Sequence, residues 1–305
     1  KRIRERKRRK KKKKRRKKKK NGKRERKKKK KREKKVREKK RRKMGSTLWW
    51  GKGASDVDKR KGCSMIIIPM AGMSSRFFKA GYSKPKYMLE LNGEFLFDLC
   101  LKSFKLYFET EHFVFILRDV FNTKSFVLQR IASLGINSYT LITLDKETRG
   151  QAETVYLAIS KLFNIEQPIT IFNIDTIRPN FIFTKFEGEN ECYIEVFRGD
   201  GDNWSFVMPS NDVKNEVIAT SEKKQISNLC CTGLYHFSTI KNFISAYEHY
   251  KNLPQENWDA GELYIAPIYN YLISNGIKVY YTEINKSDVI FCGTPREYEN
   301  LQGKK

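Results

Sequence analysis

The sequence is poor in the residues that build thiolate metal sites, disulfide frameworks and histidine-dependent catalytic triads. Its six cysteines include no Cys-x-x-Cys pair, and its three histidines are scattered, none of them in a triad-like context. Unspaced cysteines argue against a zinc site or a disulfide framework and are typical of a reducing compartment. We therefore expect a cytoplasmic protein whose chemistry needs no nucleophilic side chain.

Long hydrophobic runs are also absent. No apolar stretch reaches the roughly 18 residues of a transmembrane helix, and no signal-peptide core occurs, so no membrane span is predicted. The chain lacks the Gly-x-x-x-x-Gly-Lys-Ser/Thr spacing of a P-loop and the Gly-x-Gly-x-x-Gly of a dinucleotide site. Any phosphate-binding site must therefore use a different loop.

Net positive charge is absent from residues 65–305, because all of the chain's excess of Lys and Arg lies in residues 1–64. They hold 39 Lys and Arg against 6 Asp and Glu, whereas residues 65–305 hold 25 against 28. With almost no apolar residue before Val36, this segment is expected to be disordered. We favour the interpretation that residues 1–64 are a low-complexity extension, native or not, and that the natural protein starts at Met65. The alternative is a nucleic-acid arm or an anionic-membrane contact. No aromatic residue precedes Trp49-Trp50 and no helical apolar stripe occurs, so neither specific nucleic-acid readout nor amphipathic membrane docking is supported.

Residues 65–305 are predicted to form one α/β domain, because strand-like and helix-like patterns alternate along them. The alternation predicts a mostly parallel sheet with helices on both faces. Its predicted strands are 65–70, 113–117, 139–144 and 168–173, and its predicted helices are 95–108, 122–134 and 151–163. After residue 190 we predict further strands at 192–197, 204–208, 217–220, 229–237 and 277–282, with helices at 240–250 and 262–273.

A loop of small residues follows the first predicted strand and ends at Arg76. Small side chains let backbone N–H groups approach an anion, and Arg76 and Lys86 can both reach a polyphosphate. Asp175 follows the strand 168–173, and ligands of such sheets bind beyond the carboxyl ends of the strands. We therefore expect the loop and Asp175 to face one site. Solvated surface cations and a turn or helix-cap aspartate remain the alternatives.

Several motifs resemble the sugar-phosphate nucleotidyltransferases, a family that includes nucleoside-diphosphate-sugar pyrophosphorylases and related cytidylyltransferases of small phosphates. Met70–Phe77 and Lys84–Leu89 are similar to its signature. The other matching segments, in the family's order, are Gly150–Ala152, Asn173–Ile177, Glu222–Lys223 with Ser227–Tyr235, and Gly293–Tyr298. The resemblance covers about residues 65–301.

The resemblance implies a Rossmann-like (GT-A-type) nucleotidyltransferase fold. It also implies transfer from a nucleoside triphosphate, with CTP slightly preferred, to a phosphorylated small molecule with release of pyrophosphate. The implied catalytic residues are Arg76 and Lys86. The implied nucleotide-binding residues are Ala71, Gly72, Met73, Ser74, Ser75, Gly150 and Ala152. The implied acceptor-binding residues are Glu222, Lys223 and Gly233, and the implied Mg²⁺ ligand is Asp175.

The chain departs from the family pattern at several positions, among them Ile174, which stands where the family's metal-binding turn has glycine. Where the family usually has an aspartate as second metal ligand, this chain has Phe291, and the nearest carboxylate is Asp288. The resemblance therefore leaves two options, Asp288 or Asp175 with water, and Mg²⁺ keeps several waters in most sites. Trp204-Ser205 stands where relatives often carry Tyr-Gly near the sugar, which indicates an unusual acceptor. Glu222-Lys223 is also readable as a charged turn between two strands.

The acceptor and its pathway stay open on these grounds. Sugar 1-phosphates, choline phosphate and phosphorylated amides of capsule and other surface-polysaccharide biosynthesis are all compatible with the resemblance. A glycosyltransferase of the related fold that uses a nucleoside-diphosphate sugar is one alternative, and it predicts no pyrophosphate release. A non-catalytic nucleotide-binding module is the other.

Overall fold

The computed structural model describes residues 46–50, 64–160, 164–184, 186 and 191–303. The prediction of disorder for residues 1–64 falls outside them, apart from Ser64 and the backbone of Ser46–Trp50, which forms strand β1. Within the described part of the chain, no helix is both long and apolar enough to cross a membrane.

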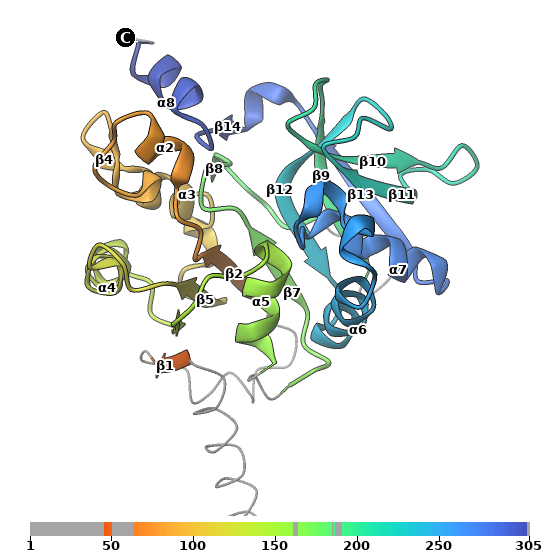
Figure 1. The fold of residues 1–305 in the computed structure, drawn as a ribbon, viewed down its shortest axis with the longest axis horizontal. Coiled ribbons are helices and arrows are strands. Elements are labelled where there is room, and N and C mark those ends of the chain that lie inside the picture. Colours follow the sequence, from red (N-terminus) through yellow and green to blue (C-terminus); the bar gives the residue numbers. More distant parts are fainter. Residues whose placement is uncertain (1–45, 51–63, 161–163, 185, 187–190, 304–305) are drawn as a thin grey trace, which may run out of the picture. The chain divides into compact units, whose positions relative to one another are not determined.

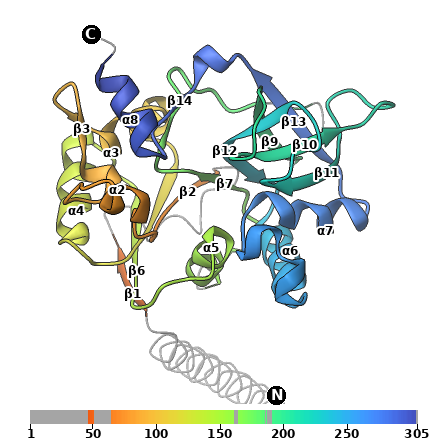
Figure 2. The same ribbon diagram turned by 45° about the horizontal axis from the view of Figure 1, so that its top comes forward.

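A ten-stranded mixed sheet organises the domain (Figures 1 and 2). Its parallel half has the order β6-β5-β2-β7, and β12 joins β7 in antiparallel fashion. The strands of the first half are β2 (Met65–Met70), β5 (His112–Leu117), β6 (Tyr139–Leu144) and β7 (Ile169–Phe172). The strands of the second half are β9 (Cys192–Arg198), β10 (Ser205–Pro209), β11 (Val217–Glu222), β12 (Leu229–Phe237) and β13 (Val279–Ile284). The predicted mostly parallel α/β sheet is confirmed.

Helices cover both faces of this sheet, and β2 shows why. All six of its residues are buried, as expected for a central parallel strand. Met65 and Ile67 pack in one hydrophobic core, and Ile66 and Ile68 pack in another on the opposite face. The first core is closed by α5 (Gln151–Ile159), α6 (Ile240–Lys251) and α7 (Tyr269–Ser274), and the second by α3 (Leu96–Lys102) and α4 (Thr123–Leu134).

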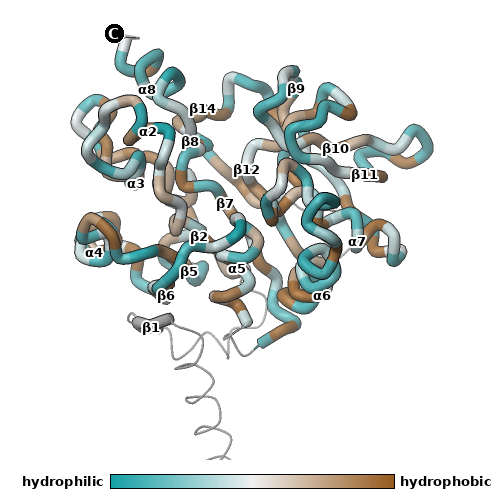
Figure 3. The backbone as a smooth tube through the Cα atoms, in the orientation of Figure 1, coloured by the Kyte–Doolittle hydropathy of each residue, from teal (hydrophilic) through white to brown (hydrophobic). Residues whose placement is uncertain are grey.

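The long helices α4 and α6 are amphipathic. In α6 the buried residues recur at helical spacing, from Ile240 through Phe243 and Tyr247 to Tyr250. Brown and teal segments accordingly alternate along both helices in Figure 3. The side chain of Thr239 caps α6 by accepting a hydrogen bond from the backbone N–H of Asn242 at 3.0 Å.

Two predicted helices are shorter in the structure. The predicted helix 95–108 ends as α3 at Lys102, and a separate 3₁₀ turn follows at Lys105–Tyr107. The predicted helix 262–273 begins instead with a 3₁₀ turn at Ala266–Ile268 and continues as α7. Pro267 explains the second difference, because proline is favoured in a first helical turn and disfavoured inside a helix.

The remaining short elements lie near the carboxyl ends of the parallel strands. They include helices α2 (Ser75–Lys79) and α8 (Pro295–Gln302), the hairpin β3 (Glu90–Leu91) with β4 (Glu94–Phe95), and the pair β8 (Thr176–Ile177) with β14 (Ile290–Phe291). The β8–β14 pair brings the segment after residue 290 back to Asp175, whose carbonyl accepts a hydrogen bond from the Cys292 N–H at 2.8 Å. Residues more than a hundred positions apart thereby meet at the site.

Candidate active site

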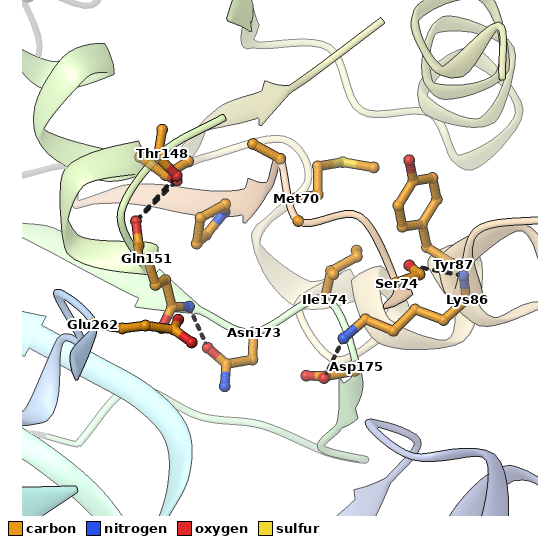
Figure 4. A pocket seen from close by; sticks show the side chains of 15 residues that line it. Met70, Ser74, Lys86, Tyr87, Thr148, Gln151, Asn173, Ile174, Asp175 and Glu262 are labelled. Atoms are coloured by element: carbon orange, nitrogen blue, oxygen red, sulfur yellow. Dashed lines mark hydrogen bonds and ion pairs between the residues drawn. The ribbon is translucent and has the colours of Figure 1, made fainter. Parts of the chain in front are cut away.

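A cavity of about 320 Å³ opens where β2, β7 and α5 meet (Figure 4). It lies beyond the carboxyl ends of the parallel strands, where ligands of such sheets bind. Its lining includes the predicted residues Ala71, Gly72, Ser74, Lys86, Gly150 and Asp175. The structure therefore brings the small-residue loop and Asp175 to one place.

The small-residue loop connects β2 to α2 through a left-handed residue, Ser74, with φ of 52°. The Ser74 hydroxyl accepts a hydrogen bond from the backbone N–H of Lys86 at 3.2 Å, which ties the loop to the segment that carries the lysine. Met73 and Ser75 line a neighbouring cavity of about 420 Å³ rather than the first one. Arg76 lines a third cavity, described below.

Lys86 and Asp175 form an ion pair across the first cavity. The Lys86 Nζ donates to the Asp175 Oδ2 at 2.5 Å, and each side chain is 22% exposed. Figure 4 shows the ammonium and the carboxylate pointing toward each other from opposite elements. The pair thus places a cation and an anion within reach of a ligand in this cavity, which the Glu262 carboxylate also lines.

Position 150 must be glycine because the backbone of Leu263 packs directly against it. Its φ is +151°, and a Cβ there would lie 2.5 Å from the Leu263 carbonyl oxygen. Ala152 is completely buried, does not line the cavity, and donates its N–H to the same carbonyl at 2.8 Å. Between them, Gln151 lines the cavity and donates its Nε2 to the Asn173 Oδ1 at 2.5 Å. The 150–152 segment is therefore fixed by the backbone that follows Glu262.

A second cavity of about 220 Å³ adjoins the first. Gln151, Asn173 and Asp175 line both, so these three residues mark the junction. Of the predicted acceptor-binding residues, Glu222 and Gly233 line the second cavity. We call this space the acceptor cavity from here on.

Glu222 ends strand β11 and is only 8% exposed, so it is not part of a solvated turn. The Ser205 hydroxyl donates to its carboxylate, and burial raises the pKa of the Glu222 carboxyl. Lys223, the next residue, donates its Nζ to the Tyr264 hydroxyl at 2.5 Å and does not line the acceptor cavity. Because Tyr264 itself lines the acceptor cavity, the Lys223 ammonium lies at the border of that cavity.

Gly233 lets β12 approach the junction closely. Its φ is +98°, and a Cβ would lie 2.6 Å from the Asn173 Nδ2. The pairing of β12 with β9 shifts register between Cys231 and Tyr235, around this glycine. The Gly233 carbonyl accepts the Asn173 N–H at 3.1 Å. The irregularity therefore positions Asn173 between the two cavities.

The structure places Asp288 away from the junction. Its carboxylate accepts a hydrogen bond from the Asn285 Nδ2 at 3.3 Å and lines neither cavity. Phe291 does line the acceptor cavity, and so does Glu297, whose Oε2 accepts the Thr294 N–H at 2.9 Å. Among the residues that the structure describes, no three His, Cys, Asp or Glu side chains form a metal-binding group.

Solved structures share this architecture. The nucleoside-diphosphate-sugar pyrophosphorylase of Vibrio cholerae RC9 is 49% identical, with a TM-score of 0.75, and the match covers 78% of this chain and 99% of that one. The chain belongs to the nucleotidyltransferase family of the nucleoside-diphosphate-sugar pyrophosphorylases. The resemblance inferred from its motifs is confirmed.

More distant structures share the fold. The inositol-1-phosphate CTP transferase of T. maritima is 16% identical, with a TM-score of 0.61, and the match covers 79% of this chain and 96% of that one. A UDP-glucose pyrophosphorylase of Acinetobacter baumanii is 15% identical, with a TM-score of 0.57 and coverage of 79% and 92%. No protein-family model and no curated protein matches the chain.

Sequence reasoning missed two cations near the small-residue loop of this pyrophosphorylase-family enzyme, Arg118 and Arg149, and Arg149 lines the cavity of about 420 Å³. Arg118 directly follows β5, and its guanidinium donates to the Met73 sulfur at 2.8 Å and to the Glu147 carboxylate at 3.0 Å. It thereby links the small-residue loop to the segment before Gly150. Its position after a buried parallel strand was the signal that could have revealed it, as it did for Asp175.

Gly150→Ala is expected to destabilise the enzyme by several kcal/mol, roughly 2–4, because the new methyl group overlaps the Leu263 backbone at a φ that alanine rarely adopts. Thermal unfolding measures the effect. The matched control is Gly72→Ala, since a Cβ on Gly72 has no atom within 4 Å. Equal melting temperatures for both variants would contradict the packing role of Gly150.

Proposed function

We propose that this enzyme transfers the nucleotidyl group of a nucleoside triphosphate, with CTP preferred, to the phosphate of a small acceptor molecule. The observation that carries the proposal is the place of the Lys86–Asp175 pair, which lies in the cavity of the small-residue loop and borders the acceptor cavity. We further propose that the reaction takes place in the cytoplasm and supplies capsule or other surface-polysaccharide biosynthesis.

The proposed reaction is a single displacement at phosphorus. An oxygen of the acceptor phosphate forms a bond to the α-phosphorus, and the bond from that phosphorus to the bridging oxygen of the β-phosphate breaks, so pyrophosphate leaves with the electron pair. Catalysis of this kind rests on positioning and charge neutralisation. Lys86 would stabilise charge on the α-phosphate, and Arg76 would offset the repulsion between the two anions. The family resemblance assigns Lys223 to the acceptor phosphate, and its contact with Tyr264 would then have to open.

The donor set at the junction fits a magnesium ion. Asp175 is a carboxylate that lines both cavities, and Mg²⁺ prefers oxygen ligands and keeps several waters. Asp175 would hold the ion, which would supply neutralising positive charge to the phosphates. Asp288 lines neither cavity, so we propose Asp175 with water as the binding mode.

A pyrophosphate-release screen tests the proposal. The purified full chain is incubated with Mg²⁺, each of the four nucleoside triphosphates and dTTP, and a panel of phosphorylated acceptors. We expect release that requires both substrates, fastest with CTP. Transfer from a nucleoside-diphosphate sugar without pyrophosphate would indicate a glycosyltransferase instead. Nucleotide binding without turnover on any acceptor would indicate a non-catalytic binding module.

A further inference from the structure

Two aromatic side chains far apart in sequence meet at the acceptor cavity. The rings of Trp204 and Phe291 lie 4.6 Å apart between centroids, and both residues line the cavity. The buried ring of Phe197 supports them from behind, at 5.0 Å from Trp204 and 5.2 Å from Phe291. Together Trp204 and Phe291 form what we call the aromatic wall, held in place by a small hydrophobic cluster.

A buried carboxylate lies on the strand next to this wall. Ser205 pairs with Glu222 across β10 and β11, and the Trp204 carbonyl accepts the N–H of Lys223 at 2.8 Å. The Ser205 hydroxyl, which donates to Glu222, lies 3.3 Å from the Tyr235 hydroxyl. A neutral hydroxyl is thus the side-chain hydrogen-bond partner of Glu222, so a cation bound in the acceptor cavity would add a direct charge pair to this carboxylate.

Two lysines approach this region without lining the cavity. The Lys286 ammonium lies 5.8 Å from the centroid of the Phe197 ring, and the charge of Lys223 opposes the effect of burial on the pKa of Glu222. Lys223 has its ammonium on the Tyr264 hydroxyl, 4.6 Å from the centroid of that ring. Among the described residues that line the acceptor cavity, Arg76 is the one Lys or Arg, and it comes from α2, which lies on the other side of the domain from β10 and β11 (Figures 1 and 2). With Lys223 held on Tyr264, a phosphorylated acceptor is best accommodated with its phosphate toward Arg76 and its other end at the aromatic wall.

We infer that the acceptor of this enzyme carries a positively charged amine or quaternary ammonium group, bound between the aromatic wall and Glu222. The faces of Trp and Phe rings attract cations, and a buried carboxylate adds direct charge pairing. This inference rests on the proposed function, because it names the chemical class of that function's acceptor. It distinguishes an amine-bearing acceptor from a neutral sugar phosphate.

Matched acceptor pairs test the inference. Phosphoethanolamine is compared with 2-hydroxyethyl phosphate, and glucosamine 1-phosphate with glucose 1-phosphate, because each pair exchanges only an ammonium for a hydroxyl. Affinity is measured by calorimetry on the full chain with Mg²⁺ and the non-hydrolysable analogue of the best nucleotide from the screen, or of CTP if none reacts. We expect the amine of at least one pair to bind at least about tenfold more tightly than its hydroxyl counterpart.

The variants assign that preference to residues. Glu222→Gln and Trp204→Leu should each reduce it to about threefold or less, whereas Trp204→Phe should retain most of it. Asp212→Asn is the matched acid-to-amide control, because Asp212 is exposed between β10 and β11 and lines none of the three cavities described above; it should keep the full preference. Thermal unfolding of each variant confirms that it is folded.

The outcomes separate the two proposals. Equal binding within both pairs, no binding of either amine, or a preference that survives in Glu222→Gln, overturns the inference about the acceptor. Pyrophosphate release with the hydroxyl compounds as fast as with the amines would leave the proposed function standing and also overturn the inference. Tighter amine binding without pyrophosphate release from any acceptor would support the binding site and overturn the proposed function.

Discussion

Lys86→Ala is expected to lower kcat/KM for pyrophosphate release by about 10²–10³-fold, equivalent to roughly 3–4 kcal/mol of transition-state stabilisation. The Lys86 ammonium is the cation already placed in the first cavity, 2.5 Å from the Asp175 carboxylate. Truncation removes that charge and leaves the Asp175 carboxylate without its partner, so less positive charge faces the phosphates. Steady-state assays with the best nucleotide and acceptor measure the loss.

Lys84→Ala provides the control for this prediction. Lys84 lies two residues earlier, is exposed and lines none of the cavities described here. Its removal takes away the same charge from the same segment, and we expect activity within about threefold of the wild type. Similar losses in both variants would show that overall charge matters rather than the place of Lys86.

Asp175→Asn is expected to cause a loss of similar size, about 10²–10³-fold, and to raise the Mg²⁺ concentration needed for half-maximal activity. An amide keeps the shape of the side chain and can still accept a hydrogen bond from Lys86, but it carries no charge to hold a divalent cation. A magnesium titration of initial rates measures both effects.

The Asp288→Asn variant tests whether Asp288 is a ligand of the magnesium ion, the alternative to Asp175 with water that the sequence left open. Because Asp288 lines neither cavity, we expect its variant to need no more Mg²⁺ than the wild type. A raised requirement in Asp288→Asn, with an unchanged one in Asp175→Asn, would falsify the assignment of the metal to Asp175.

The parallel half of the fold was predictable because its strands are largely buried, mostly apolar runs between clear breaks. β2 and β6 have the predicted bounds, and α4 begins within one residue of its prediction. The predicted helix 95–108 was wrong at its end for a physical reason. Phe104 and Phe108 are buried as its pattern requires, yet Phe104 has φ of −101° and ψ of 22°, outside the helical geometry. Burial at helical spacing therefore does not require a continuous helix.

The candidate site was predictable where strand ends determine it. The loop after β2 and Asp175 after β7 come together because parallel neighbours deliver their carboxyl ends to one edge. The aromatic wall was not predictable, since Trp204 and Phe291 meet only through the pairing of β14 with β8 and of β10 with β12. Such contacts depend on long-range strand pairing, which local patterns do not encode.

Strand β12 limits how the molecule can move. From Leu234 to Phe237 it pairs with β7 of the parallel half, and the same strand also pairs with β9 along much of its length and with β10 at Cys230. Moving the two halves of the domain apart would break the backbone hydrogen bonds that β12 makes to its neighbouring strands. Enzymes whose lobes are joined by a hinge can open without breaking such bonds. We therefore expect substrate entry and product release to involve the loops at the carboxyl ends of the strands rather than a separation of the two halves of the sheet.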